Sequence, residues 1–121
     1  MKHILFTLRQ CNAKLIDDED YVNETLRLAC DVAGATFLKS TSHKFEPQGT
    51  TAVALLSESH ISFHSWPEDG YAVCDVFTCS DGVKAEDAVL FMQKRFESPS
   101  MTLKKTVQRY EGNTNECDTV T

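Results

Sequence analysis

The stretch LLSESHISFHSWPEDGYAVCDVFTCSD, residues 55–81, decides the fold, because it predicts two strands joined by one turn. Apolar and polar side chains alternate along HISFHSW at 60–66: Ile61 and Phe63 against His60, Ser62 and His64. A period of two residues is typical of a strand that buries one face. PEDG at 67–70 carries turn residues, and YAVCDVFTC at 71–79 predicts the following strand. We therefore expect one buried face and one face rich in reactive side chains.

Outside this stretch, apolar periodicity predicts further strands at 3–9, 35–41, 51–57 and 101–110. One helix is expected from the acidic run at 17–20 to about Gly34, and another at 85–98. The order β-α-β-β-β-β-α-β predicts an α+β two-layer sandwich, in which a mainly antiparallel sheet carries both helices on one face. The other face then needs cover, which a second copy of the chain would supply.

Length and composition limit the classes of function. The chain has 121 residues, 41% hydrophobic and 25% charged, which predicts one domain over 1–121 with a poorly ordered tail at 111–121. The net charge of -6 and the lack of a Lys/Arg cluster argue against nucleic acid as a partner. We expect no signal peptide and no membrane partner, because the apolar runs are short. Five cysteines without a CxxC pair indicate a reduced, cytoplasmic protein.

Taken singly, the polar side chains of residues 55–81 are typical of solvated or core positions. His60 and His64 share one strand face, and with Cys79 or Asp75 they would suggest zinc, but a closed zinc site usually shows a second ligand pair. A Ser-His-acid hydrolase is not favoured, because the G-x-S-x-G pattern is absent. Strand parity puts Cys74 and Cys79 on opposite sides, so they do not line one pocket.

Taken together, these residues resemble the pyruvoyl-dependent S-adenosylmethionine decarboxylases of the short bacterial and archaeal class. The matching run comprises Glu58-Ser59-His60, His64, Trp66-Pro67-Glu68, Gly70-Tyr71 and Asp75-Val76-Phe77-Thr78-Cys79. Upstream, GAT at 34–36 and HKFEPQG at 43–49 match as well. The resemblance spans about residues 3–110 and is most specific over 43–79. It implies an enzyme that supplies the aminopropyl donor for spermidine and polyamine synthesis.

The resemblance also implies a zymogen that makes its own cofactor. Decarboxylation of an amino acid needs an electron sink, which ordinary side chains do not provide. By analogy, the Ser59 hydroxyl attacks the Glu58 carbonyl, and loss of the Ser59 α-proton eliminates the resulting ester. Hydrolysis of the dehydroalanine then gives a pyruvoyl group and ammonia. The products are a β chain, 1–58, and an α chain, 59–121, and the family needs no metal and no pyridoxal phosphate.

Catalytic roles carry over from the family one residue at a time. His64 corresponds to the base that takes the α-proton during processing. Thr51 corresponds to a hydroxyl residue that stabilises the oxyanion during cleavage. Cys79 corresponds to the acid that reprotonates the substrate carbon, after the Schiff base between substrate and pyruvoyl ketone has lost CO2.

Substrate contacts are implied in the same way. Phe45 and Trp66 correspond to aromatic residues that pack the adenine and attract the sulfonium cation. Glu68 corresponds to the acid that accepts the ribose hydroxyls. Without the family context, the two aromatic residues would be equally typical of core packing.

Strand geometry adds a prediction about assembly. Five residues of extended strand span about 16 Å, so His64 does not easily reach the Ser59 of its own chain. We therefore expect a homodimer of αβ protomers with composite sites at its interface, as in the family. The expected division is Ser59 and Cys79 from one protomer, with Phe45, Thr51, His64 and Glu68 from the other.

The chain departs from the family pattern at six positions: Thr7, Leu8, Arg9, Lys39, Ser42 and Ser80. Because the first strand contributes to the family's pocket, ornithine and arginine are kept as alternative substrates for the same chemistry. A non-catalytic partner that activates another subunit is the third hypothesis. Such a protein would be expected to lose Ser59 or Cys79, and both are present.

Overall fold

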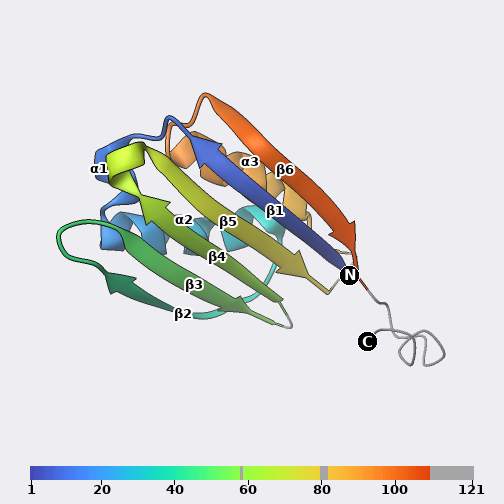
Figure 1. Ribbon diagram of the computed structural model, residues 1–121. Coiled ribbons are helices and arrows are strands. Elements are labelled where there is room, and N and C mark those ends of the chain that lie inside the picture. Colours follow the sequence, from blue (N-terminus) through green and yellow to red (C-terminus); the bar gives the residue numbers. More distant parts are fainter. Residues whose placement is uncertain (58, 80–81, 110–121) are drawn as a thin grey trace, which may run out of the picture.

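The described residues form two layers, a six-stranded antiparallel sheet and a layer containing helices α2 and α3 (Figure 1). The computed structural model describes residues 1–57, 59–79 and 82–109. The strands are β1 (Lys2–Arg9), β2 (Phe37–Lys44), β3 (Thr50–Leu56), β4 (Ser59–Trp66), β5 (Tyr71–Thr78) and β6 (Ser100–Gln108). The helices are α1 (Ala13–Ile16), α2 (Glu19–Ala33) and α3 (Ala85–Arg95), with the 3-10 helix η1 (Pro67–Asp69). The strand order is β2-β3-β4-β5-β1-β6.

Helix α2 begins and ends at residues suited to those positions. The Asp18 side chain accepts a hydrogen bond from the Tyr21 backbone N–H at 3.0 Å, which satisfies one free donor of the first turn. Gly34 follows the last turn with a φ of 76°, a left-handed conformation that glycine adopts at little cost. The buried side of the helix consists of Val22, Thr25, Leu26, Ala29, Cys30 and Ala33.

Strand β4 turns one face toward the helices, as its alternation predicts. Ile61 and Phe63 are fully buried, and the Phe63 ring lies 4.9 Å from that of Phe96 at the end of α3. Burial of side chains of this size stabilises the fold by about 1.5–3 kcal/mol each. Antiparallel pairing with β5 sets Phe63 opposite Cys74, which is buried on the same side.

The opposite side of the sheet, called the open face below, carries no helix in the described part of the chain (Figure 1). Four large apolar side chains on it are between 38% and 40% exposed: Leu5, Leu55, Trp66 and Val73. Apolar side chains exposed on one face of a sheet are compatible with a surface that another chain covers. The open face is therefore the surface that a second copy of the chain is expected to cover.

The expected fold class and order of elements are confirmed, with α1 and η1 added. The expected strand at 35–41 instead runs over Phe37–Lys44, because its pairing with β3 continues until Lys44 lies opposite Thr50. The expected helix at 85–98 ends at Arg95, because Glu97 takes a φ of 57° that breaks the helix. The tail expected at 111–121 lies outside the described residues. Within them, none of the helices has the length and apolar character needed to cross a membrane.

Candidate functional site

A pocket of about 450 Å³ lies at the end of the sheet where β2 turns into β3. Its lining consists of Phe45, Glu46, Gln48, Gly49, Thr51, His64, Ser65, Trp66 and Glu68. The family resemblance implies roles for five of these residues, namely Phe45, Thr51, His64, Trp66 and Glu68. The volume falls within the range of pockets that hold small-molecule ligands, about 300–1,000 Å³.

The aromatic walls of this pocket are not core residues. Phe45 is 46% exposed and Trp66 is 38% exposed, which excludes simple core packing for both. The Trp66 ring stacks on Tyr71, with centroids 5.1 Å apart and planes tilted by 13°. Glu68 follows within η1, where Gly70 ends the turn in a left-handed conformation. The acidic Glu68 thus lines the same pocket as the exposed ring of Trp66.

The loop that carries Phe45 is anchored by Asp17, which follows α1. Asp17 Oδ1 accepts a hydrogen bond from the Gly49 backbone N–H at 2.7 Å and lies 2.9 Å from Lys44 Nζ. Within the loop, the Phe45 N–H donates to the Gly49 carbonyl at 2.8 Å. Gly49 has a φ of 111°, and a Cβ there would meet the Ser65 carbonyl oxygen at 3.4 Å. Sequence reasoning missed Asp17, because it is distant in the chain and outside every matched motif.

The electrostatics of Asp17 follow from these contacts. Burial by itself would raise the pKa of Asp17, but hydrogen bonds from Gly49 and Lys44 and the Lys44 charge lower it below its usual value. A carboxylate with a lowered pKa is more strongly bound in its charged form. The ionised form of Asp17 therefore stabilises the pocket loop.

His64 and Thr51 form a hydrogen-bonded pair inside the pocket. The two residues are cross-strand partners on β3 and β4, and Thr51 Oγ1 lies 3.0 Å from His64 Nδ1. The pair fixes the imidazole by one nitrogen and leaves the other free for a ligand.

Ser59 and Cys79 meet at the other end of β4. The Cys79 backbone N–H donates to Ser59 Oγ at 3.3 Å. Because β4 runs five residues from Ser59 to His64, about 16 Å separate the two groups. Ser59 and Cys79 therefore lie apart from the pocket of the same chain. Glu58 and Ser80 lie outside the described residues.

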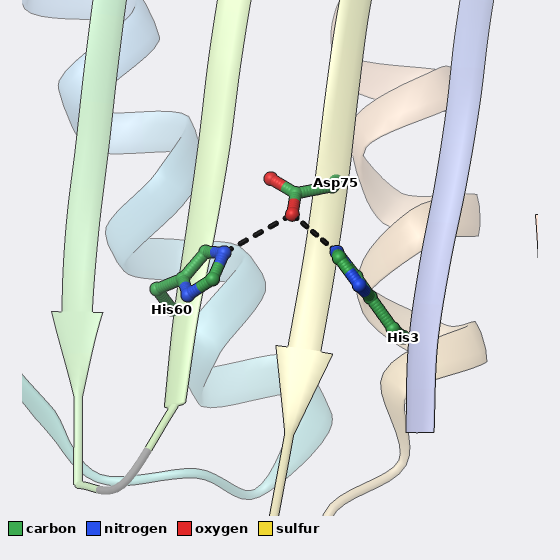
Figure 2. Close-up of side chains that lie close together, drawn as sticks. All are labelled: His3, His60 and Asp75. Atoms are coloured by element: carbon green, nitrogen blue, oxygen red, sulfur yellow. Dashed lines mark hydrogen bonds and ion pairs between the residues drawn. The ribbon is translucent and has the colours of Figure 1, made fainter. Parts of the chain in front are cut away.

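A second polar cluster lies on the open face, on three neighbouring strands (Figure 2). Asp75 Oδ2 lies 2.5 Å from His3 Nε2 and 3.0 Å from His60 Nε2, and Ser62 Oγ donates to Asp75 Oδ1. Burial would raise the pKa of Asp75, but these hydrogen bonds, first that of Ser62, lower it. The zinc ligand set that the sequence did not favour is met only in part, because His60 contacts Asp75 but His64 does not. His64 pairs with Thr51, while His3 joins His60.

The departures from the family pattern have structural explanations in part. Leu8 is fully buried in the core, and neither it, Thr7 nor Arg9 lines the pocket. Ser42 points toward α2, where it donates to Glu19 Oε2 at 2.6 Å and accepts from Asn23 at 2.8 Å.

Comparison with known proteins gives consistent matches over nearly the whole chain. A family model described as S-adenosylmethionine decarboxylase matches residues 2–109. The S-adenosylmethionine decarboxylase proenzyme of Prochlorococcus marinus is 46% identical over 108 residues, 89% of this chain and 88% of that one. The proenzyme of the same name from Methanococcus maripaludis is 45% identical over the same shares. The crystal structure of the adenosylmethionine decarboxylase from Aquifex aeolicus matches with a TM-score of 0.80 and 34% identity, covering 93% of this chain and 96% of that one.

These matches place the chain in the carboxy-lyase class of enzymes, and its fold is that of a solved adenosylmethionine decarboxylase. Within that class, the chain belongs to the S-adenosylmethionine decarboxylase family.

We predict that Asp17→Asn destabilises the protein by about 1–2 kcal/mol at pH 7, because a charged acceptor is lost from the pocket loop. Since the folded pKa of Asp17 is lowered, its contribution is present above the unfolded pKa of about 3.9 and is lost as pH falls through the folded pKa. Urea unfolding of both proteins, at neutral pH and at about pH 3, measures this difference. Asp31→Asn, which removes an exposed pair with Arg27 on α2, is the matched control and should change stability by less than about 0.5 kcal/mol. Equal effects of the two variants at neutral pH contradict the prediction.

Proposed function

We propose that this protein decarboxylates S-adenosylmethionine, after cleaving itself between Glu58 and Ser59 to form a pyruvoyl group. The observation that carries the proposal is the contact between Ser59 and Cys79 in a chain that matches the family over residues 2–109. The decarboxylated product is the aminopropyl donor for polyamine synthesis.

The Ser59 environment fits the chemistry of processing. Ser59 is the first residue of β4, and its Oγ accepts a hydrogen bond from the Cys79 backbone N–H. In processing, this oxygen forms a bond to the Glu58 carbonyl carbon as the peptide C–N bond breaks. When the Ser59 α-proton is removed, the same oxygen leaves, so only a residue with a β-oxygen suits the position.

His64 is proposed as the base for that proton, with Thr51 as its orienting partner. If His64 Nδ1–H donates to Thr51 Oγ1, the Nε2 lone pair is free to accept a proton. The same Thr51 hydroxyl borders the pocket, where it can stabilise the developing oxyanion. The two residues thus act as one unit on the processing side.

The pocket suits a nucleoside with a cationic side chain. The exposed faces of Phe45 and Trp66 offer a stacking surface for adenine and attract a sulfonium. Glu68 supplies acceptor oxygens for the ribose hydroxyls. The pyruvoyl ketone, when formed, supplies the electron sink for loss of CO2. Cys79 then delivers a proton to the substrate carbon.

A two-fold dimer brings two half-sites together, one formed by Ser59 and Cys79 and the other by the pocket. Ser59 and His64 lie at opposite ends of β4 in one chain, and the open face exposes apolar side chains between them. In an isologous interface each contact occurs twice, so each Ser59 meets His64 of the partner subunit. The complete site then contains Ser59 and Cys79 from one protomer and the pocket residues from the other.

Ser59→Ala should remain a single chain, because alanine has no oxygen to attack the preceding carbonyl. The wild-type protein should give two fragments that meet between Glu58 and Ser59, as measured by intact-mass spectrometry. Ser57→Ala, two residues away, should cleave like wild type. A folded wild-type protein that keeps an ordinary serine at 59 would overturn the proposal and would support the activating-partner hypothesis.

Cys79→Ala should still cleave, but its steady-state turnover should fall about 10²–10⁴-fold, since the proton donor that completes each cycle is lost. The assay measures labelled CO2 from carboxyl-labelled S-adenosylmethionine, ornithine and arginine, with wild type expected to act on the first. Cys74→Ala, a buried cysteine on the helix side, is the control and should keep its turnover. Normal turnover by Cys79→Ala would rule out Cys79 as the proton donor. Release of CO2 from ornithine or arginine, but not from S-adenosylmethionine, would overturn the proposed substrate.

A mixed dimer tests whether His64 acts on the neighbouring chain. His64→Ala and Ser59→Ala should each stay uncleaved when expressed alone. When the two are co-expressed, the His64→Ala chain should be cleaved, because the Ser59→Ala chain supplies an intact histidine. Co-expression of His64→Ala with the double variant Ser59→Ala/His64→Ala should leave both chains uncleaved. If the mixed dimer forms and stays uncleaved, processing does not use His64 of the partner subunit.

A further inference from the structure

We propose that His3, His60 and Asp75 form a binding site for a divalent transition-metal ion such as Zn²⁺. Their donor atoms lie within 4.8 Å of one another, on β1, β4 and β5 (Figure 2). Two imidazoles and one carboxylate are a donor set that binds Zn²⁺ and leaves a further position for water. Imidazole nitrogen also favours Zn²⁺ or Co²⁺ over Mg²⁺ and Ca²⁺, which prefer oxygen.

The surroundings orient the three donors. Ser62 Oγ donates to Asp75 Oδ1, so the other carboxylate oxygen, Oδ2, faces the two histidines. The Phe77 ring lies 5.4 Å from the His3 ring and 5.6 Å from the His60 ring, forming an apolar wall beside them. Hydrogen bonds and apolar packing of this kind fix ligand orientation in metal sites. The His3 and Asp75 side chains are 17% and 18% exposed in the single chain, so an ion would lose part of its water on binding, and a second copy over the open face would enclose it further.

Arg109 competes with an ion for His3. Its Nη1 lies 3.1 Å from His3 Nδ1, and because a guanidinium only donates, that nitrogen presents a lone pair. The His3 proton is then on Nε2, where it points at Asp75. An ion that binds Nε2 moves this proton to Nδ1, so Arg109 must turn away. Arg109 is exposed, which makes this movement cheap. Removal of Arg109 should therefore tighten binding.

The proposed ion does not depend on the decarboxylase chemistry. The pocket lies at the His64 end of β4, whereas the ion would lie at the Ser59 end, held by the residue that follows Ser59. None of the steps proposed for processing or turnover uses the ion. Failure of the metal site would leave the proposed activity intact, and the reverse also holds.

The experiment uses untagged, full-length protein freed of metal by a chelator and then titrated with Co²⁺ or Zn²⁺. One ion per chain is expected, and the Co²⁺ form should show visible ligand-field bands without intense sulfur charge-transfer bands. X-ray absorption of the Zn²⁺ form should show two imidazoles and no sulfur. The absence of binding, or coordination by cysteine sulfur, would overturn the proposal without any variant.

Single substitutions locate the ion. Loss of a supporting hydrogen bond weakens metal sites by about 10–100-fold, so Ser62→Ala should fall in that range, and His3→Ala and Asp75→Asn should weaken binding at least as much. His43→Ala, also on the open face but outside the cluster, is the control and should bind like wild type. Arg109→Gln should bind more tightly than wild type. Unchanged affinity in His3→Ala, or equal loss in His43→Ala, contradicts the site, while circular dichroism verifies that each variant is folded.

Discussion

Strand β4 is held between β3 and β5 in an antiparallel register that pairs Thr51 with His64 and Phe63 with Cys74. This register decides which side chains enter the core and which face away from the helices. Because side chains alternate at every residue, a slip of one position would bury His60 and His64 and expose Ile61 and Phe63. Both half-sites therefore depend on the same packing that fills the core.

The same strand separates groups that act together in the proposed chemistry. Ser59 and His64 are fixed at the two ends of a rigid element, so a movement within one chain does not join them. The open face between them exposes Leu5, Leu55 and Val73. Association through this face would bury apolar surface and complete the sites in one step. Stability of the dimer and assembly of the active site would then have one physical origin.

The pocket depends on contacts from outside the sheet. The turn between β2 and β3 extends past the end of the strands, where the ladder gives it no support. Asp17 supplies that support by accepting from Gly49 and pairing with Lys44. The Ser65 hydroxyl links the same region to the carbonyl of Ile16 at 2.6 Å. Helix α1 and the following residue thus position Phe45, although neither touches the pocket.

Local pattern in the sequence determined much of this protein. The alternation in 60–66 predicted the two faces of β4, and the rise per residue of a strand predicted that Ser59 and His64 lie far apart. The family motifs named the pocket residues Phe45, Trp66 and Glu68, which the fold brings together. Only the tertiary structure set His3 beside Asp75, 72 positions away, and Asp17 beside Gly49, 32 positions away. Periodicity predicts which face of a strand a side chain occupies. Which residues lie next to it on that face depends on strand order and helix packing, and these depend on the whole core.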